Sequence, residues 1–80
     1  MARYHLNLHE CGTVYADEEG VDLPDPEAAR AQAIKEARSI MAAEVREGQL
    51  CLSCHIEVAD DLGHVILKIA FKDAVAVTGL

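Results

Sequence analysis

Asp17–Arg30 (DEEGVDLPDPEAAR) is the stretch where the chain changes from strand to helix. Its acidic, glycine-containing first half is typical of a solvated turn. In its second half, Asp25 can accept hydrogen bonds from the unpaired N–H groups of a first helical turn. Pro26 suits the first helical position, where its missing N–H has no partner to lose, and Glu27 is favourable near the positive end of the helix dipole. The stretch therefore predicts a helix that begins at Pro26.

The predicted helix runs to about Glu47, because Gly48 readily adopts the positive φ found just after a helix C-terminus. Apolar residues recur at helical spacing and fall on one stripe of this helix. The stripe consists of Ala29, Ala33, Ile34, Ala37, Ile40, Met41 and Val45. Its small alanines would let the helix lie close to a sheet.

Two segments before the helix show the two-residue alternation of half-buried strands. Residues 2–9 place Ala2, Tyr4, Leu6 and Leu8 on one face. A turn at Glu10-Cys11-Gly12 follows, and residues 13–16 resume as a short strand with Val14 directed inward. These segments predict a β-hairpin.

Two further strands are predicted after the helix. Residues 50–58 alternate, and residues 60–63 form a polar turn. The last long strand directs Val65, Leu67, Ile69 and Phe71 inward, and a break at residues 73–74 precedes a short extension at residues 75–77.

The expected fold class is α+β with the order β-β-α-β-β, in which one helix packs on a four-stranded, mostly antiparallel sheet. Eighty residues predict a single domain that spans residues 1–80. A right-handed crossover favours the strand order 2-1-3-4, with 2-1-4-3 as the alternative.

The charge balance excludes several classes of partner. Fourteen acidic residues against seven basic ones give a formal net charge of −7, and no stripe of Lys or Arg is present to neutralise phosphates. Nucleic acid and anionic membranes are therefore unexpected partners. The N-terminal residues contain no apolar signal-peptide core, and the longest apolar run, Val65 to Phe71, is too short to cross a bilayer. We expect a cytoplasmic protein with reduced cysteines.

Cys51-Leu52-Ser53-Cys54-His55 matches the C-x-x-C-H pattern of covalent haem attachment. Within a strand, however, Cys51 and Cys54 would point to opposite faces, with their Cα atoms about 10 Å apart. That spacing disfavours a haem, a disulfide or a single zinc knuckle. We expect Cys54 to be a small buried hydrophobe and Cys51 to lie at the start of the strand.

Strand parity places all four histidines, His5, His9, His55 and His64, on the face away from the helix. Neighbouring strands could bring two or three of them within the distance that zinc, copper or nickel requires. The same face also carries Asn7, Thr13, Tyr15, Ser53, Glu57, Ile66 and Lys68. This mixture suits a protein interface or plain exposure to solvent better than a metal site.

Sequence signals for catalysis are missing. The chain has no nucleophile elbow, phosphate-binding loop, dinucleotide fingerprint or H-E-x-x-H motif. The acidic residues of the turn do not follow the spacing of a calcium-binding loop. We therefore expect no enzyme, and we predict no catalytic, cofactor-binding or metal-binding residues.

The order of several short motifs resembles a family of short bacterial proteins known only as a domain of unknown function. The motifs are Arg3-Tyr4-His5-Leu6-Asn7-Leu8, residues 17–25, residues 27–33, Ile56-Glu57-Val58, residues 61–65 and residues 71–75. The resemblance covers nearly the whole chain and implies no activity or cofactor. The C-x-x-C-H residues lie outside its pattern. A fainter likeness links the chain to small acidic antitoxins of the HicB type, although it lacks their glycine-cysteine turn before the helix.

Three functional hypotheses remain. The first is a non-enzymatic protein-interaction module that forms a homodimer, because the exposed sheet face combines Tyr15 and Ile66 with histidines. The second is a metal- or haem-binding protein that uses Cys51, Cys54 and the histidines of the sheet. The third is an antitoxin-like regulator that binds a basic protein partner.

Overall fold

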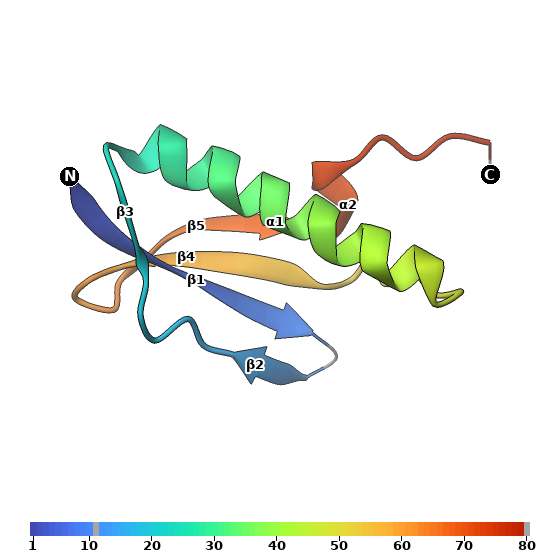
Figure 1. Cartoon of the computed structure of the whole chain (residues 1–80), viewed down its shortest axis with the longest axis horizontal. Helices are drawn as coiled ribbons and strands as arrows, with labels where there is room; N and C mark the ends of the chain where they lie inside the picture. The colour runs from blue at the N-terminus through green and yellow to red at the C-terminus, as the bar shows by residue number, and fades with distance from the viewer. Residues whose placement is uncertain (11, 80) are drawn as a thin grey trace.

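The structure is a computed structural model that describes residues 1–10 and 12–79 (Figure 1). Cys11, in the predicted hairpin turn, and Leu80 lie outside the described residues. The elements in chain order are β1 (Ala2–Glu10), β2 (Thr13–Tyr15), β3 (Val21–Leu23), α1 (Pro26–Arg46), β4 (His55–Asp60), β5 (Val65–Ala70) and α2 (Phe71–Ala74). The fold is α+β with one long helix, as predicted.

All the strand pairs are antiparallel, and the main path of the sheet is β2-β1-β4-β5. This arrangement confirms the predicted order 2-1-3-4 for the four expected strands. A fifth strand was not predicted: β3 pairs with residues 2–4 of β1, while β2 pairs with residues 8–10 of the same strand. The two short strands therefore share one edge of β1. Sequence reasoning missed β3 because it is only three residues long and follows an acidic turn.

Helix α1 begins where the sequence predicts. The carboxylate of Asp25 accepts a hydrogen bond from the Ala28 N–H at 2.8 Å. The helix ends at Arg46, and Gly48 adopts a φ of +83° two residues later. Figure 1 shows α1 lying along the sheet, where it contacts β4, β5 and β3.

The core lies between α1 and one face of the sheet. The helix buries Ala29, Ala33, Ala37 and Met41, and the sheet, the segment just before β4 and α2 contribute Tyr4, Leu6, Cys54, Ile56, Val58, Ile69, Phe71 and Ala74. Burial of a large side chain such as Ile56 or Phe71 contributes roughly 1.5–3 kcal/mol. Ile34 and Ile40 pack at the border of this core, but Val45 is exposed, so the predicted stripe extends one turn too far.

The strands after the helix differ from the prediction at their ends. The chain bends at residues 52–53, so β4 begins at His55 instead of residue 50. Strand β5 stops at Ala70, and Phe71 starts the one-turn helix α2, where its N–H donates to the Cys54 carbonyl oxygen at 2.9 Å. Residues 75–77 are not a strand, which corrects the predicted extension.

Two predicted inward residues face the opposite side. The register of β5 shifts at Val58–Ala59, so that Val65 pairs with Ala59. Because paired residues lie on the same face, Val65 is on the open side of the sheet. Val14 pairs with His9 and is also exposed there. Tyr15, predicted on the face away from the helix, instead pairs with the core-packed Leu8 and so lies on the helix side. Alternation within a strand does not reveal a bulge or the register of a hairpin, and either one reverses the faces of a strand.

Candidate functional site

The sheet face away from α1 carries most of the ionisable groups that could perform chemistry. His5 and His9 come from β1 and His55 from β4, as parity predicts. His64 instead lies in the turn between β4 and β5, where its side chain is mostly exposed. We call the face that bears His5, His9 and His55 the open face.

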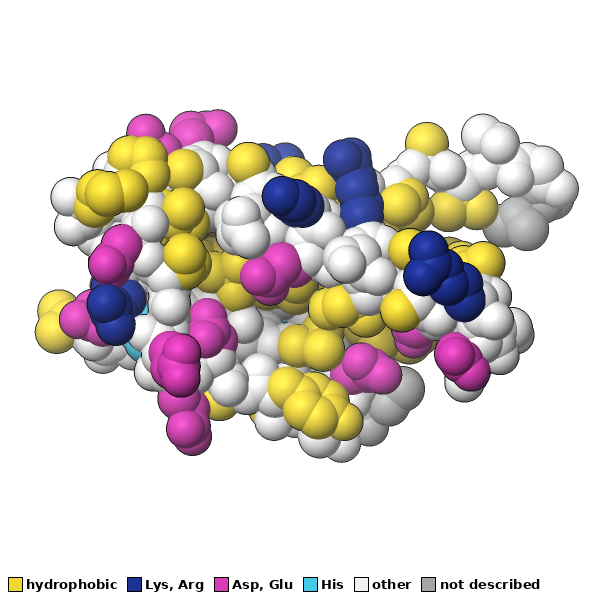
Figure 2. Space-filling view, viewed as in Figure 1, with side chains coloured by type: hydrophobic (Ala, Val, Ile, Leu, Met, Phe, Trp, Pro, Cys, Tyr) yellow, Lys and Arg dark blue, Asp and Glu magenta, His cyan; other side chains and the backbone are white. Residues whose placement is uncertain are grey.

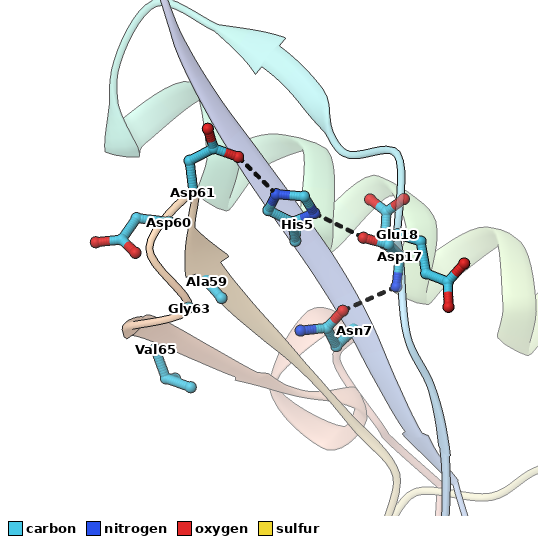
Figure 3. Close-up of a pocket in the computed structure, with 9 residues that line it drawn as sticks. All are labelled: His5, Asn7, Asp17, Glu18, Ala59, Asp60, Asp61, Gly63 and Val65. Carbon is cyan, nitrogen blue, oxygen red and sulfur yellow. Dashed lines mark hydrogen bonds and ion pairs between the residues drawn. The ribbon is translucent and has the colours of Figure 1, made fainter.

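His5 lies at one end of the open face, between two oxygen acceptors (Figure 3). Its Nδ1 is 2.7 Å from the Asp17 carbonyl oxygen, and its Nε2 is 3.1 Å from Asp61 Oδ1. A neutral imidazole carries one N–H and can satisfy only one of these acceptors, whereas the imidazolium satisfies both. The hydrogen bond to the Asp17 carbonyl, followed by the one to Asp61, raises the pKa of His5 above its ordinary value.

Asp17 connects the segment between β2 and β3 to the middle of β1. Its carboxylate accepts hydrogen bonds from the Leu6 N–H at 3.2 Å and the Gly20 N–H at 3.1 Å, and its own N–H donates to Asn7 Oδ1 at 2.8 Å. Because neither β2 nor β3 pairs with Leu6, the carboxylate takes the place of a strand partner there. These contacts hold the edge of the sheet together.

Gly20 closes the same corner. It has a φ of +74°, and a Cβ atom at this position would lie 2.9 Å from Arg3 Cγ and 3.0 Å from both His5 Cε1 and the Tyr4 carbonyl oxygen. Only glycine combines this backbone conformation with such close packing. The acidic stretch that resembles a family motif therefore has a structural role at the outer edge of β1.

A shallow hollow of about 390 Å³ lies beside His5 and is lined by Asn7, Asp17, Glu18, Ala59, Asp60, Asp61, Gly63 and Val65 (Figure 3). The Asp60 carboxylate accepts from the N–H groups of His64 and Leu62, which lowers the pKa of Asp60 and fixes the β4–β5 turn. Acidic side chains also cover the segment between β2 and β3, in the lower left of Figure 2. The polar groups in this region are largely used to hold the turns.

A second group lies at the other end of the open face. His9 and His55 are direct partners across β1 and β4, and their rings stack with centroids 4.5 Å apart and planes inclined by 13°. Glu57 Oε1 is 2.7 Å from His9 Nε2, and Glu57 Oε2 is 3.7 Å from His55 Nε2. One carboxylate therefore faces both imidazoles. We call His9, His55 and Glu57 the histidine–glutamate cluster.

The surroundings of this cluster favour the neutral form of His55. Partial burial, followed by the positive charges of Lys68 and His9, lowers the pKa of His55 despite the nearby Glu57. A hollow of about 330 Å³ lies beside both rings and is also lined by Gly12, Thr13, Val14 and Ser53. Within residues 1–10 and 12–79, this cluster is the group of three or more His, Cys, Asp or Glu residues whose ligand atoms all lie within 4.8 Å of one another. The sequence analysis placed both histidines and Glu57 on this face, but it did not group Glu57 with the histidines as a possible ligand.

The two cysteines of the C-x-x-C-H motif lie side by side, which corrects the expectation that they point apart. Their Sγ atoms are 2.8 Å apart, and Cys51 Sγ is 3.3 Å from Ser53 Oγ. The reason is the bend at residues 52–53, which replaces the extended strand on which the 10 Å separation depended. Cys54 is 2% exposed and belongs to the core, as predicted, while His55 lies on the open face. The motif is thus divided between the two sides of the sheet.

Strand β5 forms the free edge of the sheet, opposite the edge that carries β2 and β3. In the described part of the chain, only β4 pairs with it. Val65 and Ile66 are 55% and 39% exposed, and Leu62 in the preceding turn is 82% exposed. Apolar side chains therefore lie beside an unpaired strand edge.

Neither of the two described helices is long and apolar enough to cross a lipid bilayer.

Comparison with known proteins gives one match. A family model described as Domain of unknown function (DUF6894) matches residues 3–72, which include α1 and all the described strands apart from Ala2, the first residue of β1. No curated protein and no solved structure matches the chain significantly. The match confirms the resemblance drawn from the ordered motifs. The chain therefore belongs to the family of the domain of unknown function DUF6894.

Proposed function

We propose that the chain is a non-enzymatic protein-interaction module that forms a homodimer through the outer edge of β5. The single observation that supports this proposal is the unpaired edge of β5 next to exposed Val65, Ile66 and Leu62. An unpaired edge presents N–H and C=O groups that another strand can satisfy. A second copy of β5, antiparallel to the first, would join the two sheets by a self-complementary contact.

The charges on β5 are compatible with such a contact. Lys68 is the one charged residue of this strand, and it lies directly opposite Glu57 on β4. Its charge therefore faces a carboxylate of its own sheet. This reduces the protection against pairing with a second strand that a lysine on a sheet edge normally gives. The acidic segment between β2 and β3 follows the opposite edge of the sheet. Two chains of net charge −7 could then approach with much of their negative charge kept apart.

Sedimentation equilibrium over a range of micromolar concentrations tests the proposal. The wild-type chain is expected to dimerise, and Ile66→Lys is expected to be monomeric because it replaces an exposed apolar side chain of β5 with an unpaired charge. Val45→Lys is the matched control, since Val45 is exposed on α1 and away from β5. A wild-type chain that remains monomeric throughout the range would overturn the proposal.

A basic protein partner is the second candidate, and the acidic side chains over the β2–β3 segment favour it (Figure 2). This function would be antitoxin-like. A small basic protein encoded in the neighbouring reading frame should then bind the wild-type chain and bind Glu18→Lys/Glu19→Lys more weakly. Equal binding of both chains, or an unrelated neighbour, would argue against this function.

A further inference from the structure

We propose that the histidine–glutamate cluster is a binding site for a divalent transition-metal ion of the zinc class. His9, His55 and Glu57 would supply one ligand each, from two neighbouring strands at the centre of the sheet. The site lies on the open face and does not involve the outer edge of β5. It is therefore independent of the proposed dimer.

The distances in the cluster are close to those of a metal centre. An ion with bonds of about 2.0–2.2 Å holds its ligand atoms roughly 3–3.5 Å apart. The three ligand atoms already lie within 4.8 Å of one another, and Glu57 Oε1 lies 2.7 Å from His9 Nε2. The two imidazoles are stacked almost parallel, so side-chain rotations that unstack them would be needed to direct both ring nitrogens at one ion.

The backbone supports this arrangement. His9 and His55 are paired residues in a central strand pair, and Glu57 is two residues from His55 on the same face. Ligands that project from strands of a sheet are held more precisely than ligands on loops. The exposed fractions of the three side chains lie between 21% and 28%, so the cluster is sheltered but open to solvent on one side.

The chemistry of the donors indicates which ions would bind. Two imidazoles and one carboxylate suit Zn²⁺, and also Ni²⁺ and Cu²⁺, better than Ca²⁺ or Mg²⁺, which prefer all-oxygen sites. Three protein ligands leave at least one coordination position for water or a small anion. The adjacent hollow, with the hydroxyl-bearing residues Thr13 and Ser53 in its lining, offers space for that ligand.

Lys68 opposes the ion and provides an internal check. It lies across from Glu57, and its charge already acts on His55. A positive charge on the residue paired with Glu57 disfavours a divalent cation at the cluster, so Lys68→Gln should bind zinc more tightly than the wild-type chain. A site formed by the cysteines would not respond in this way, because Cys54 lies on the core side of the sheet.

Isothermal titration calorimetry of the full chain with ZnCl₂ is the first experiment. The wild-type chain is expected to bind one zinc ion per chain. His9→Ala and Glu57→Gln should each weaken binding by at least about tenfold, since even partners of metal ligands contribute 10–100-fold to affinity. His64→Ala is the matched control, because it removes an exposed histidine outside the cluster and should leave binding unchanged.

The spectrum of bound Co²⁺ separates this site from a thiolate site. Coordination by His and Glu gives only weak visible bands, whereas coordination by cysteine adds an intense thiolate-to-cobalt absorption in the near ultraviolet. Absence of zinc binding would overturn the proposal, and so would equal affinities of the wild-type, His9→Ala and Glu57→Gln chains or a thiolate absorption. Ile66→Lys should still bind zinc, so failure of the dimer and failure of the metal site can be distinguished.

Discussion

The two ends of the open face use similar residues in different ways. At one end, His5 lies between Asp17 and Asp61, and both of its ring nitrogens face oxygen acceptors of the protein. At the other end, His9 and His55 share the single carboxylate of Glu57 beside an open hollow. The first histidine has a raised pKa, whereas His55 has a lowered one.

The difference shows that the type of side chain does not determine its role. Around His5, the carboxylate of Asp17 is committed to backbone N–H groups that no strand satisfies. Around His9, the carboxylate of Glu57 faces the imidazoles of His9 and His55, and neither of these contacts is with the backbone. We therefore assign the His5 end to the stability of the fold and the His9 end to binding. The following predictions test that assignment, beginning with the largest effect.

Gly20→Ala should destabilise the chain most. A methyl group there would meet Arg3, His5 and the Tyr4 carbonyl oxygen within about 3 Å, at a positive φ. We expect a loss of about 2–4 kcal/mol in the free energy of unfolding, from backbone strain and overpacking together. Urea denaturation measures it.

Gly48→Ala is the matched control for this substitution. Gly48 also has a positive φ, of +83°, but no atom lies within 4 Å of the added Cβ. The expected loss is about 1 kcal/mol, from backbone strain alone. Equal losses for the two variants would show that the corner around His5 is not tightly packed.

Asp17→Ala should cause the second-largest loss of stability. It removes the acceptor of the Leu6 and Gly20 N–H groups and should cost about 1.5–3 kcal/mol, because hydrogen bonds to a charged group are stronger than average. Glu18→Ala, which changes an exposed neighbour, should stay within about 0.5 kcal/mol. Thermal unfolding followed by circular dichroism compares them. Similar unfolding midpoint temperatures for the two variants would show that Asp17 has no structural role.

Glu57→Gln should have a smaller effect on the metal-free chain. Its contacts with His9 and His55 are partly solvated ion pairs, which contribute at most about 1 kcal/mol. Added Zn²⁺ should raise the unfolding temperature of the wild-type chain and not that of Glu57→Gln. A large loss of stability of Glu57→Gln without metal would instead show that Glu57 stabilises the fold.

The smallest effect is a pH dependence due to His5. Because its folded pKa is raised, the stability it contributes is complete below the ordinary histidine pKa of about 6.5. That stability is lost as the pH rises through the higher folded pKa. His55 acts with the opposite sign, since its lowered pKa costs stability as the pH falls below about 6.5.

Urea midpoints measured from pH 6.5 upward should therefore fall in the wild-type chain. The slope should be flatter in His5→Gln than in the wild-type chain. An unchanged slope in His5→Gln would contradict the role given to the two acceptors of His5.

Most of the fold could be predicted from local patterns. The start of α1 follows from Asp25 and Pro26, and the strand order follows from the crossover through one helix. The errors have a common cause, which is that the backbone departs from regular alternation. The shift at Val58–Ala59 turned Val65 outward, and the bend at residues 52–53 brought the two cysteines together. Such departures depend on contacts between distant segments, which alternation along one strand does not contain.

The candidate site was predictable only in part. Parity placed His5, His9 and His55 on one face, but the register of β1 against β4 decides that His9, and not His5, pairs with His55. Asp17 could not be assigned from sequence, because its role depends on the gap that β2 and β3 leave along β1. What the sequence did not reveal was therefore which carboxylate lies beside each histidine.

Histidine-resolved NMR during a zinc titration tests the division of the open face most directly. The ring nitrogen signals of ¹⁵N-labelled His9 and His55 should shift together and reach saturation at one zinc ion per chain, while those of His5 and His64 stay in place. A shift of the His5 signals at the same zinc concentration, or no shift at His9 and His55, would contradict the account.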